Sequence, residues 1–135
     1  MHDNADVPVM IVDDEAHLRI TAGQTLELAG YIPRPFESAE AALAELETDF
    51  AGVVVSDIRM PGMDGMALLR EVRRRDPDLP VILITGHGDI STAVEAMREG
   101  AWDFLEKPFP ASAWSKWCDA AAKSAASAWK TAPQG

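Results

Sequence analysis

Short runs of hydrophobic residues alternate along this chain with longer segments in which hydrophobic residues recur every three or four positions. A strand buried on both faces of a parallel sheet is nearly continuous in Val, Ile and Leu, whereas a helix that covers the sheet has one hydrophobic face. The three clearest runs are residues 9–12, 52–56 and 80–85. The alternation therefore predicts an α/β domain with a parallel sheet and helices on both of its faces.

Two weaker strands complete the predicted sheet, at residues 31–36 and 101–105. Pro33 and Pro35 lack the N–H group that a central strand needs, so the strand at 31–36 is expected at an edge of the sheet. The segments between the strands have helical spacing. The expected helices are residues 15–29, 38–47, 64–75 and 90–99, and a fifth helix after Pro110.

Length and composition bound the possible functions. A chain of 135 residues with 47% hydrophobic and 25% charged residues is typical of one globular domain. The net charge of -10 argues against binding of nucleic acid or an anionic membrane surface by this chain itself. The single cysteine, Cys118, excludes an internal disulfide framework, and no hydrophobic run reaches the length of about 20 residues that spans a bilayer. We therefore expect a cytoplasmic protein.

Polar residues occur where the predicted strands end. Asp13 and Asp14 follow the first strand, Asp57 follows the third, Thr85 ends the fourth and Lys107 follows the fifth. In a right-handed β-α array the carboxyl ends of the strands lie along one edge of the sheet, which is where open α/β sheets bind their ligands. These five residues are therefore expected in one crevice.

The chemistry of such a crevice follows from its residue types. Three crowded carboxylates repel one another unless a cation neutralises them, and an oxygen-seeking ion such as Mg²⁺ is the natural partner. The Asp57 carboxylate can then act as a nucleophile toward phosphorus and form an acyl phosphate. Lys107 would offer a positive charge to the phosphoryl oxygens, and the Thr85 hydroxyl would donate a hydrogen bond to them.

Four segments carry a resemblance to a known family. IVDDE (11–15), SDIRMPGMDG (56–65), ITGHGD (84–89) and EKPF (106–109) resemble the receiver domains of two-component response regulators. The resemblance covers roughly residues 7–110. It implies a flavodoxin-like, doubly wound, five-stranded parallel sheet with strand order 2-1-3-4-5.

The same resemblance implies a function. A sensor histidine kinase would phosphorylate Asp57 with the help of Mg²⁺ or Mn²⁺, and phosphorylation would switch the domain, which could form a receiver homodimer. The domain would be no enzyme beyond its own phosphorylation and dephosphorylation. A phosphatase with an aspartyl intermediate is the competing enzyme class, but such enzymes usually have a second acid two residues after the nucleophile, where this chain has Arg59.

Roles for individual residues also follow from the resemblance. Asp14 and Asp57 would bind the metal by their side chains, Asp13 mainly through water, and Arg59 through its backbone carbonyl. Thr85 would sense the phosphoryl group, and Phe104 would be the aromatic side chain that changes its exposure. The bond between Lys107 and Pro108 would be cis, which an X-Pro bond allows.

Two segments refine the resemblance. The sequence from Thr85 to Ile90 and the segment EGAWDFLEKPF are most similar to receivers of enhancer-binding transcription activators of the nitrogen or C4-dicarboxylate type. A transcription activator output is therefore expected. The alternative is a stand-alone receiver that acts as an adaptor or passes the phosphoryl group on.

The two ends of the chain differ from the middle. We expect residues 1–6 to be disordered, residues 7–110 to form the receiver core, and residues 111–135 to be an atypical segment in place of a regular fifth helix and linker. Residues 111–135 hold three of the four tryptophans and lack the Leu, Val and Ile stripe of an amphipathic helix. One hypothesis is that this segment is a frameshifted translation of a longer regulator.

Each candidate residue also has a structural interpretation. Asp13 or Asp14 could cap the helix that begins near Glu15, Asp57 could be a turn residue, and Thr85 could simply end a strand. Phe104 could be ordinary core. The remaining expectations are turn roles for Pro61, Gly62 and Gly65, exposed positions for His17 and His87, and an inert Cys118.

Overall fold

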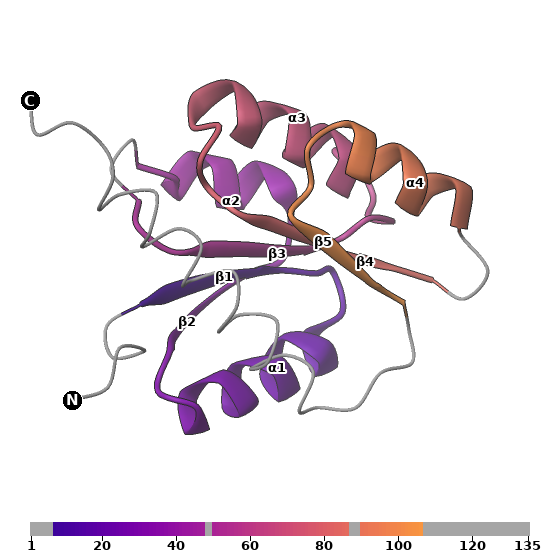
Figure 1. Ribbon diagram of the computed structural model, residues 1–135. Coiled ribbons are helices and arrows are strands. Elements are labelled where there is room, and N and C mark those ends of the chain that lie inside the picture. The colour runs from indigo at the N-terminus through magenta and orange to yellow at the C-terminus, as the bar shows by residue number, and fades with distance from the viewer. Residues whose placement is uncertain (1–6, 48–49, 87–89, 107–135) are drawn as a thin grey trace, which may run out of the picture.

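The computed structural model describes residues 7–47, 50–86 and 90–106. Strands and helices alternate along them, as the hydrophobic pattern predicts (Figure 1). The strands are β1 (Pro8–Val12), β2 (Ile32–Phe36), β3 (Val53–Asp57), β4 (Val81–Thr85) and β5 (Asp103–Glu106). The helices are α1 (Ala16–Leu28), α2 (Ala39–Glu45), α3 (Gly65–Arg75) and α4 (Ile90–Arg98). The expected fifth helix and the segments 1–6 and 111–135 lie outside the described residues.

The five strands form one parallel sheet in the order β2-β1-β3-β4-β5, which confirms the expected topology. Helix α1 covers one face of the sheet, and α2, α3 and α4 cover the other (Figure 1). Two hydrophobic clusters follow from this layering. One lies between the sheet and α2, α3 and α4 and includes Met10, Leu69 and Leu83; the other, which includes Ile11 and Leu26, lies on the side of α1.

The edge position of β2 is confirmed, since β2 pairs only with β1 within the described sheet. The Ile32 N–H donates to the Val7 carbonyl (2.9 Å), and the Phe36 carbonyl accepts from the Asp13 N–H (3.1 Å). Because the N–H and C=O groups of a strand residue point to the same side and alternate along the strand, Pro33 and Pro35 face the free edge. Proline therefore replaces only positions at which no hydrogen bond to β1 is lost.

Strand β5 begins two residues later than expected. Strand β5 begins at Asp103 rather than at residue 101, because α4 ends in a turn at Gly100, which has a φ of 102°. The Ala101 N–H donates back to the Ala96 carbonyl (3.0 Å), so Ala101 still belongs to the end of the helix. The other described boundaries lie within two residues of the expected ones, and Asp57 is the last residue of β3 rather than the residue after it.

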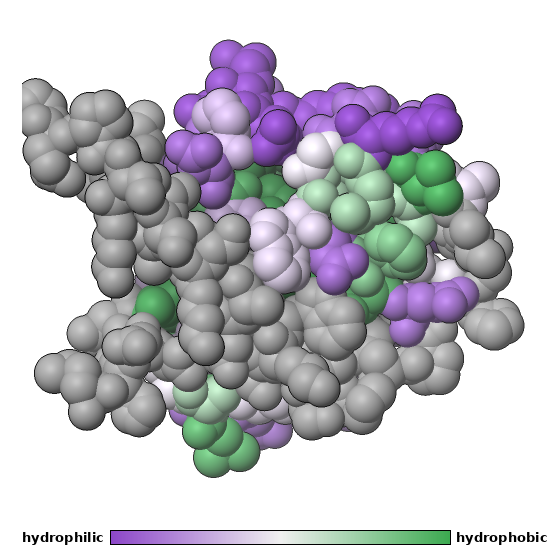
Figure 2. Space-filling model, viewed as in Figure 1, coloured by the Kyte–Doolittle hydropathy of each residue, from purple (hydrophilic) through white to green (hydrophobic). Residues whose placement is uncertain are grey.

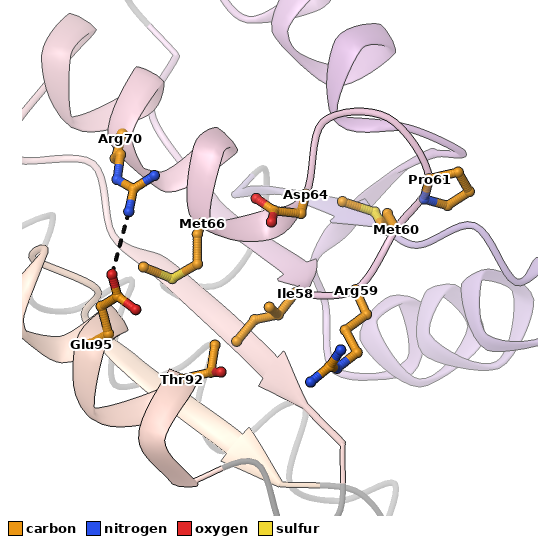
Figure 3. A pocket seen from close by; sticks show the side chains of 9 residues that line it. All are labelled: Ile58, Arg59, Met60, Pro61, Asp64, Met66, Arg70, Thr92 and Glu95. Carbon is orange, nitrogen blue, oxygen red and sulfur yellow. Dashed lines mark ion pairs between the residues drawn. The ribbon is translucent and has the colours of Figure 1, made fainter.

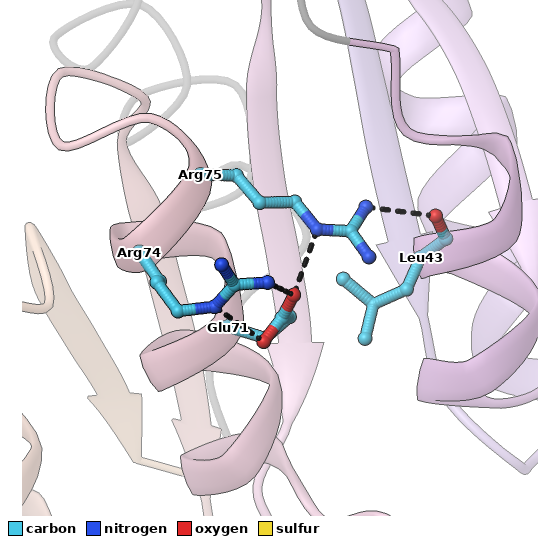
Figure 4. A network of polar contacts seen from close by, with 4 residues as sticks. All are labelled: Leu43, Glu71, Arg74 and Arg75. Atoms are coloured by element: carbon cyan, nitrogen blue, oxygen red, sulfur yellow. Dashed lines mark hydrogen bonds and ion pairs between the residues drawn. The ribbon is translucent and has the colours of Figure 1, made fainter.

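A charged network fastens α3 to α2 (Figure 4). Both Arg74 and Arg75 donate hydrogen bonds to the Glu71 carboxylate on the same helix, and Arg75 also donates to the backbone carbonyl of Leu43 at the end of α2 (3.1 Å). The bonds from Arg74 and Arg75 lower the pKa of Glu71 to about 2. Without hydrogen bonds from arginine, the pKa of a glutamate on an exposed helix would not be lowered in this way.

Hydrophobic side chains are exposed over part of the helical surface. Figure 2 shows green, hydrophobic residues in the region of α4, next to the purple, hydrophilic surface that lies above them in this view. Val94 and Met97, both on α4, are 47% and 42% exposed. Among the described helices, none is long and apolar enough to cross a membrane.

Candidate functional site

The carboxyl ends of β1, β3 and β4 bring the candidate residues to one edge of the sheet. Asp13 follows the last residue of β1, and Asp57 and Thr85 are the last residues of β3 and β4. Asp57 pairs in register with Ile84, the residue before Thr85. Both Asp57 and Thr85 are buried, with exposed fractions of 7% and 2%.

Three carboxylates gather at this edge. Asp13, Asp14 and Asp57 each offer a carboxylate oxygen, and these oxygens lie within 4.8 Å of one another. Asp13 and Asp57 are buried, whereas Asp14 is exposed. Two of the three carboxylates are therefore held inside the domain, and the third leaves the cluster accessible to a cation from solvent.

Asp13 is fixed by hydrogen bonds on its backbone and on its side chain. Its N–H donates to the Phe36 carbonyl (3.1 Å), and its Oδ1 accepts from the Glu15 N–H (2.8 Å). Its carbonyl accepts from the Arg19 guanidinium on α1 (2.5 Å). Asp13 thus holds the N–H of Glu15, the residue before α1, rather than an N–H within the helix, and is also part of the carboxylate cluster.

The position of Asp57 depends on the turn that follows it. The Arg59 N–H donates to Asp57 Oδ1 (3.3 Å), and the Ser56 hydroxyl donates to the Asp57 carbonyl (2.9 Å). The Gly65 N–H donates to the Ile58 carbonyl (2.8 Å), so the start of α3 returns to the end of β3. These contacts orient the carboxylate and its neighbouring main chain.

Further contacts hold the loop between β3 and α3. Gly62 has a φ of 75°, which confirms its turn role. The Glu40 carboxylate on α2 accepts from the Met63 N–H (3.2 Å), and the Asp64 side chain caps α3 by accepting from the Ala67 N–H (2.9 Å). The loop that begins at Asp57 is thus tied to two helices.

An open cavity of about 600 Å³ lies beside this loop, between α3 and α4 (Figure 3). Arg59, Met66 and Thr92 are among its lining residues. Across the cavity, Arg70 of α3 forms ion pairs with Glu95 of α4 (3.6 Å) and with Glu99 (3.4 Å), the residue after α4. Charged side chains therefore bridge a gap that hydrophobic packing leaves open.

The other predicted residues divide into described and undescribed ones. Phe104 is half-buried on β5 and pairs in register with Leu83, and His17 is exposed as expected. Lys107 and the bond to Pro108, together with His87 and Cys118, lie outside the described residues.

The sequence analysis missed two contacts of the site, those of Arg19 and Glu40. Arg19 is six residues after Asp13 and is the fourth residue of a helix that begins beside the cluster, so its place in the sequence could have indicated the contact. Glu40 contacts a residue 23 positions further along the chain. No local pattern connects two residues that are so far apart in the sequence.

Comparison with protein families gives a match to the response regulator receiver domain over residues 9–116. The C4-dicarboxylate transport transcriptional regulatory protein DctD of Rhizobium meliloti is 59% identical over 103 residues, which are 76% of this chain and 22% of DctD. The DNA-binding transcriptional regulator NtrC of Salmonella typhimurium is 46% identical over 101 residues, which are 75% of this chain and 22% of NtrC. The chain thus spans less than a quarter of the length of these relatives.

Solved structures with similar sequences have the same fold. The receiver domain of NtrX from Brucella abortus superposes with a TM-score of 0.80 at 39% identity, covering 85% of this chain and 98% of that domain. The structure FixJ-N superposes with a TM-score of 0.77 at 42% identity, covering 87% of this chain and 94% of its own.

Proposed function

Because the chain belongs to the response regulator receiver domain family, we propose that it is a phosphorylation-activated switch whose phosphoryl acceptor is Asp57. The observation that carries this proposal is the gathering of the Asp13, Asp14 and Asp57 carboxylates within 4.8 Å. Like charges this close repel one another unless a cation neutralises them. Repulsion within the cluster therefore destabilises the folded state. A role in binding a cation and a phosphoryl group would explain why the cluster is present.

In the proposed reaction, an Asp57 carboxylate oxygen attacks the phosphorus of a phosphohistidine on a sensor histidine kinase. The P–N bond breaks, its electron pair stays on the imidazole nitrogen, and that nitrogen takes up a proton while the new P–O bond forms an aspartyl phosphate. The hydrogen bond from the Arg59 N–H to Oδ1 orients the nucleophile. Attack of water on the phosphorus later breaks the P–O bond to Asp57, which releases inorganic phosphate and restores the carboxylate.

The donor set of the cluster fits a hard divalent cation, because every donor is an oxygen. We assign the side chains of Asp14 and Asp57 and the carbonyl of Arg59 as ligands of Mg²⁺ or Mn²⁺, with Asp13 acting through water. When bound, the ion supplies positive charge that neutralises the carboxylates and the incoming phosphoryl oxygens.

The switch follows from the charge that phosphorylation adds, about -1.5 to -2 on a phosphoryl group near pH 7. We propose that the Thr85 hydroxyl and the Lys107 ammonium move toward the phosphoryl oxygens and that the Phe104 ring changes its exposure. Thr85 is buried at the end of β4, directly beside the register position of Asp57, which supports its role. The phosphoryl group can shift the domain only through contacts that differ between its two conformations.

The output of the switch belongs to the longer proteins that this chain resembles. Two DctD relatives, of which the chain covers 22% and 24%, are named as transcriptional regulatory proteins. We propose that this domain regulates a transcription activator in the cytoplasm. Its net charge of -10 disfavours binding of nucleic acid by the domain itself. A receiver homodimer could form on the face of α4 that exposes Val94 and Met97.

The proposal is tested by the intact mass of the chain after incubation with Mg²⁺ and acetyl phosphate. The expected result is a gain of one phosphoryl group that disappears with Asp57→Asn and with excess chelator. Asp78→Asn is the matched control, because Asp78 is exposed and precedes β4 at the opposite edge of the sheet. A folded wild-type chain that gains no mass, or a gain that persists in Asp57→Asn, would reject Asp57 as the acceptor.

A further inference from the structure

We propose that Arg19 is a positioning residue for the metal site, acting through the main chain of Asp13 rather than through a ligand of its own. The inference rests on the proposed function, since it concerns the same carboxylates. Its basis is the hydrogen bond of 2.5 Å from the Arg19 guanidinium to the Asp13 carbonyl. That carbonyl is in the peptide group that joins Asp13 to Asp14, so Arg19 fixes the link between two members of the cluster.

The Asp13 side chain holds the turn between β1 and α1 from one side, since its Oδ1 accepts from the Glu15 N–H (2.8 Å). Glu15 occupies the position before α1 but makes no capping hydrogen bond with its side chain. The Arg19 N–H closes the first helical turn on the Glu15 carbonyl (3.2 Å), and its guanidinium reaches back to the Asp13 carbonyl. Arg19 therefore connects the first turn of α1 to the main chain of Asp13.

The Arg19 side chain is itself supported. It is half-buried and lines a hollow of about 300 Å³ between α1 and β2, together with Gly23, Pro33 and Pro35. A long side chain that lies along such a surface loses less freedom when its head group forms a hydrogen bond. Packing of the Arg19 side chain thus favours the hydrogen bond to Asp13, in addition to the positive charge of the guanidinium.

Loss of the Arg19 charge and loss of its hydrogen bond to Asp13 should change the affinity for metal in opposite directions. A guanidinium near a cation site repels the cation, so charge alone predicts that removal of Arg19 strengthens metal binding. Loss of a group that orients metal ligands weakens metal binding, commonly by 10-fold or more. The sign of the change therefore distinguishes a positioning residue from a nearby charge.

The experiment measures binding of Mn²⁺ to the full chain by the electron paramagnetic resonance signal of the free ion. We expect Arg19→Met to raise the dissociation constant about tenfold and Arg19→Lys, which keeps a donor and the charge, to restore part of the loss. Arg34→Met removes the same charge from β2 and should stay within about twofold of wild type. In phosphorylation by acetyl phosphate, the Mg²⁺ concentration for half-maximal rate should rise in Arg19→Met, while the rate at saturating Mg²⁺ recovers.

Each outcome decides one question. Unchanged or tighter Mn²⁺ binding by a folded Arg19→Met chain overturns the inference. If circular dichroism shows that Arg19→Met does not fold, Arg19→Leu takes its place, because it also removes both the charge and the donor; weaker binding supports positioning, and equal or tighter binding overturns it. Failure of the wild-type chain to bind Mn²⁺ at all would instead reject the metal site of the proposed function.

Discussion

Gly65 lies against the backbone of Asp57. A methyl group on the Gly65 α-carbon would come within 2.5 Å of the Asp57 carbonyl oxygen and within 2.7 Å of the Ile58 α-carbon. Both neighbours are main-chain atoms that cannot swing aside as a side chain can. The first residue of α3 is therefore small because the helix starts in contact with the end of the strand that carries the proposed phosphoryl acceptor.

Gly65→Ala is expected to lower both stability and phosphorylation. The added methyl group must push α3 and the end of β3 apart, which should reduce the free energy of unfolding by about 1–3 kcal/mol. The displaced Asp57 carboxylate should also react more slowly with acetyl phosphate. Urea unfolding and the rate of mass gain measure the two effects.

Gly23→Ala provides the matched control for Gly65→Ala. Gly23 lies within α1, and its added methyl group would meet the Pro33 side chain at an ordinary contact distance of 3.8 Å. Because alanine favours helix more than glycine does, the expected change is a stabilisation of about 0.5–1 kcal/mol. Equal destabilisation by both substitutions would contradict the close contact at Gly65.

Asp14→Asn should have opposite effects in the absence and presence of metal. Without Mg²⁺, the substitution removes one of three mutually repelling charges and is expected to raise the melting temperature. With Mg²⁺, wild type should gain stability as the ion binds the folded state, by about 2.7 kcal/mol at a hundredfold excess over Kd, and Asp14→Asn should gain much less.

Thermal unfolding in chelator and in Mg²⁺ checks this pair of effects. Asp78→Asn has the same change of charge away from the cluster and should respond to Mg²⁺ as wild type does. A mutant that is less stable than wild type in chelator would show that Asp14 has a favourable contact in place of repulsion.

Glu71 should titrate well below an ordinary glutamate. Hydrogen bonds from Arg74 and then from Arg75 lower its pKa from 4.5 to about 2. Since the folded state favours the ionised form, the contribution of Glu71 to stability is complete above pH 4.5 and is lost as the pH falls toward 2. Titration of the Glu71 carboxyl carbon by NMR measures the midpoint. Arg74→Met should move it upward, and a midpoint near 4.5 in the wild type would exclude the network in solution.

The ion pairs of Arg70 are expected to restrain α4. They connect α3 to Glu95 and Glu99 across a cavity, and the side chains of Arg70 and Glu95 are more than half exposed, so their effect on global stability should be small. Arg70→Met should still speed amide hydrogen exchange in α4 by about two- to fivefold, because local opening requires only these contacts to break. Arg34→Met should leave exchange in α4 unchanged. Exchange that is equally fast in all helices would indicate general destabilisation instead.

The layer arrangement and the cluster of carboxylates could be predicted because both depend on local patterns. Continuous hydrophobic runs identify buried strands, and parallel connections place the residues after those runs at one edge of the sheet. Asp13, Asp14 and Asp57 each follow or end such a run, so their proximity required no knowledge of side-chain packing. The edge position of β2 followed in the same way from its prolines.

Details that depend on contacts across the chain were not predictable. The start of β5 was placed two residues too early, because Ala101 is hydrophobic and its hydrogen bond to Ala96 is invisible in the hydrophobic pattern. The contact of Glu40 with the loop after β3 depends on how α2 packs beside that loop. Such contacts follow from the fold as a whole rather than from any segment.

The prolines of β2 have a consequence for the behaviour of many copies of the domain. An exposed edge of a sheet is a template on which another chain can add a strand and start aggregation. Here Pro33 and Pro35 face outward. An added strand would need N–H donors at these two alternate positions, and proline offers only a carbonyl group there. Addition of a strand from another copy of the domain is therefore disfavoured at this edge of the sheet.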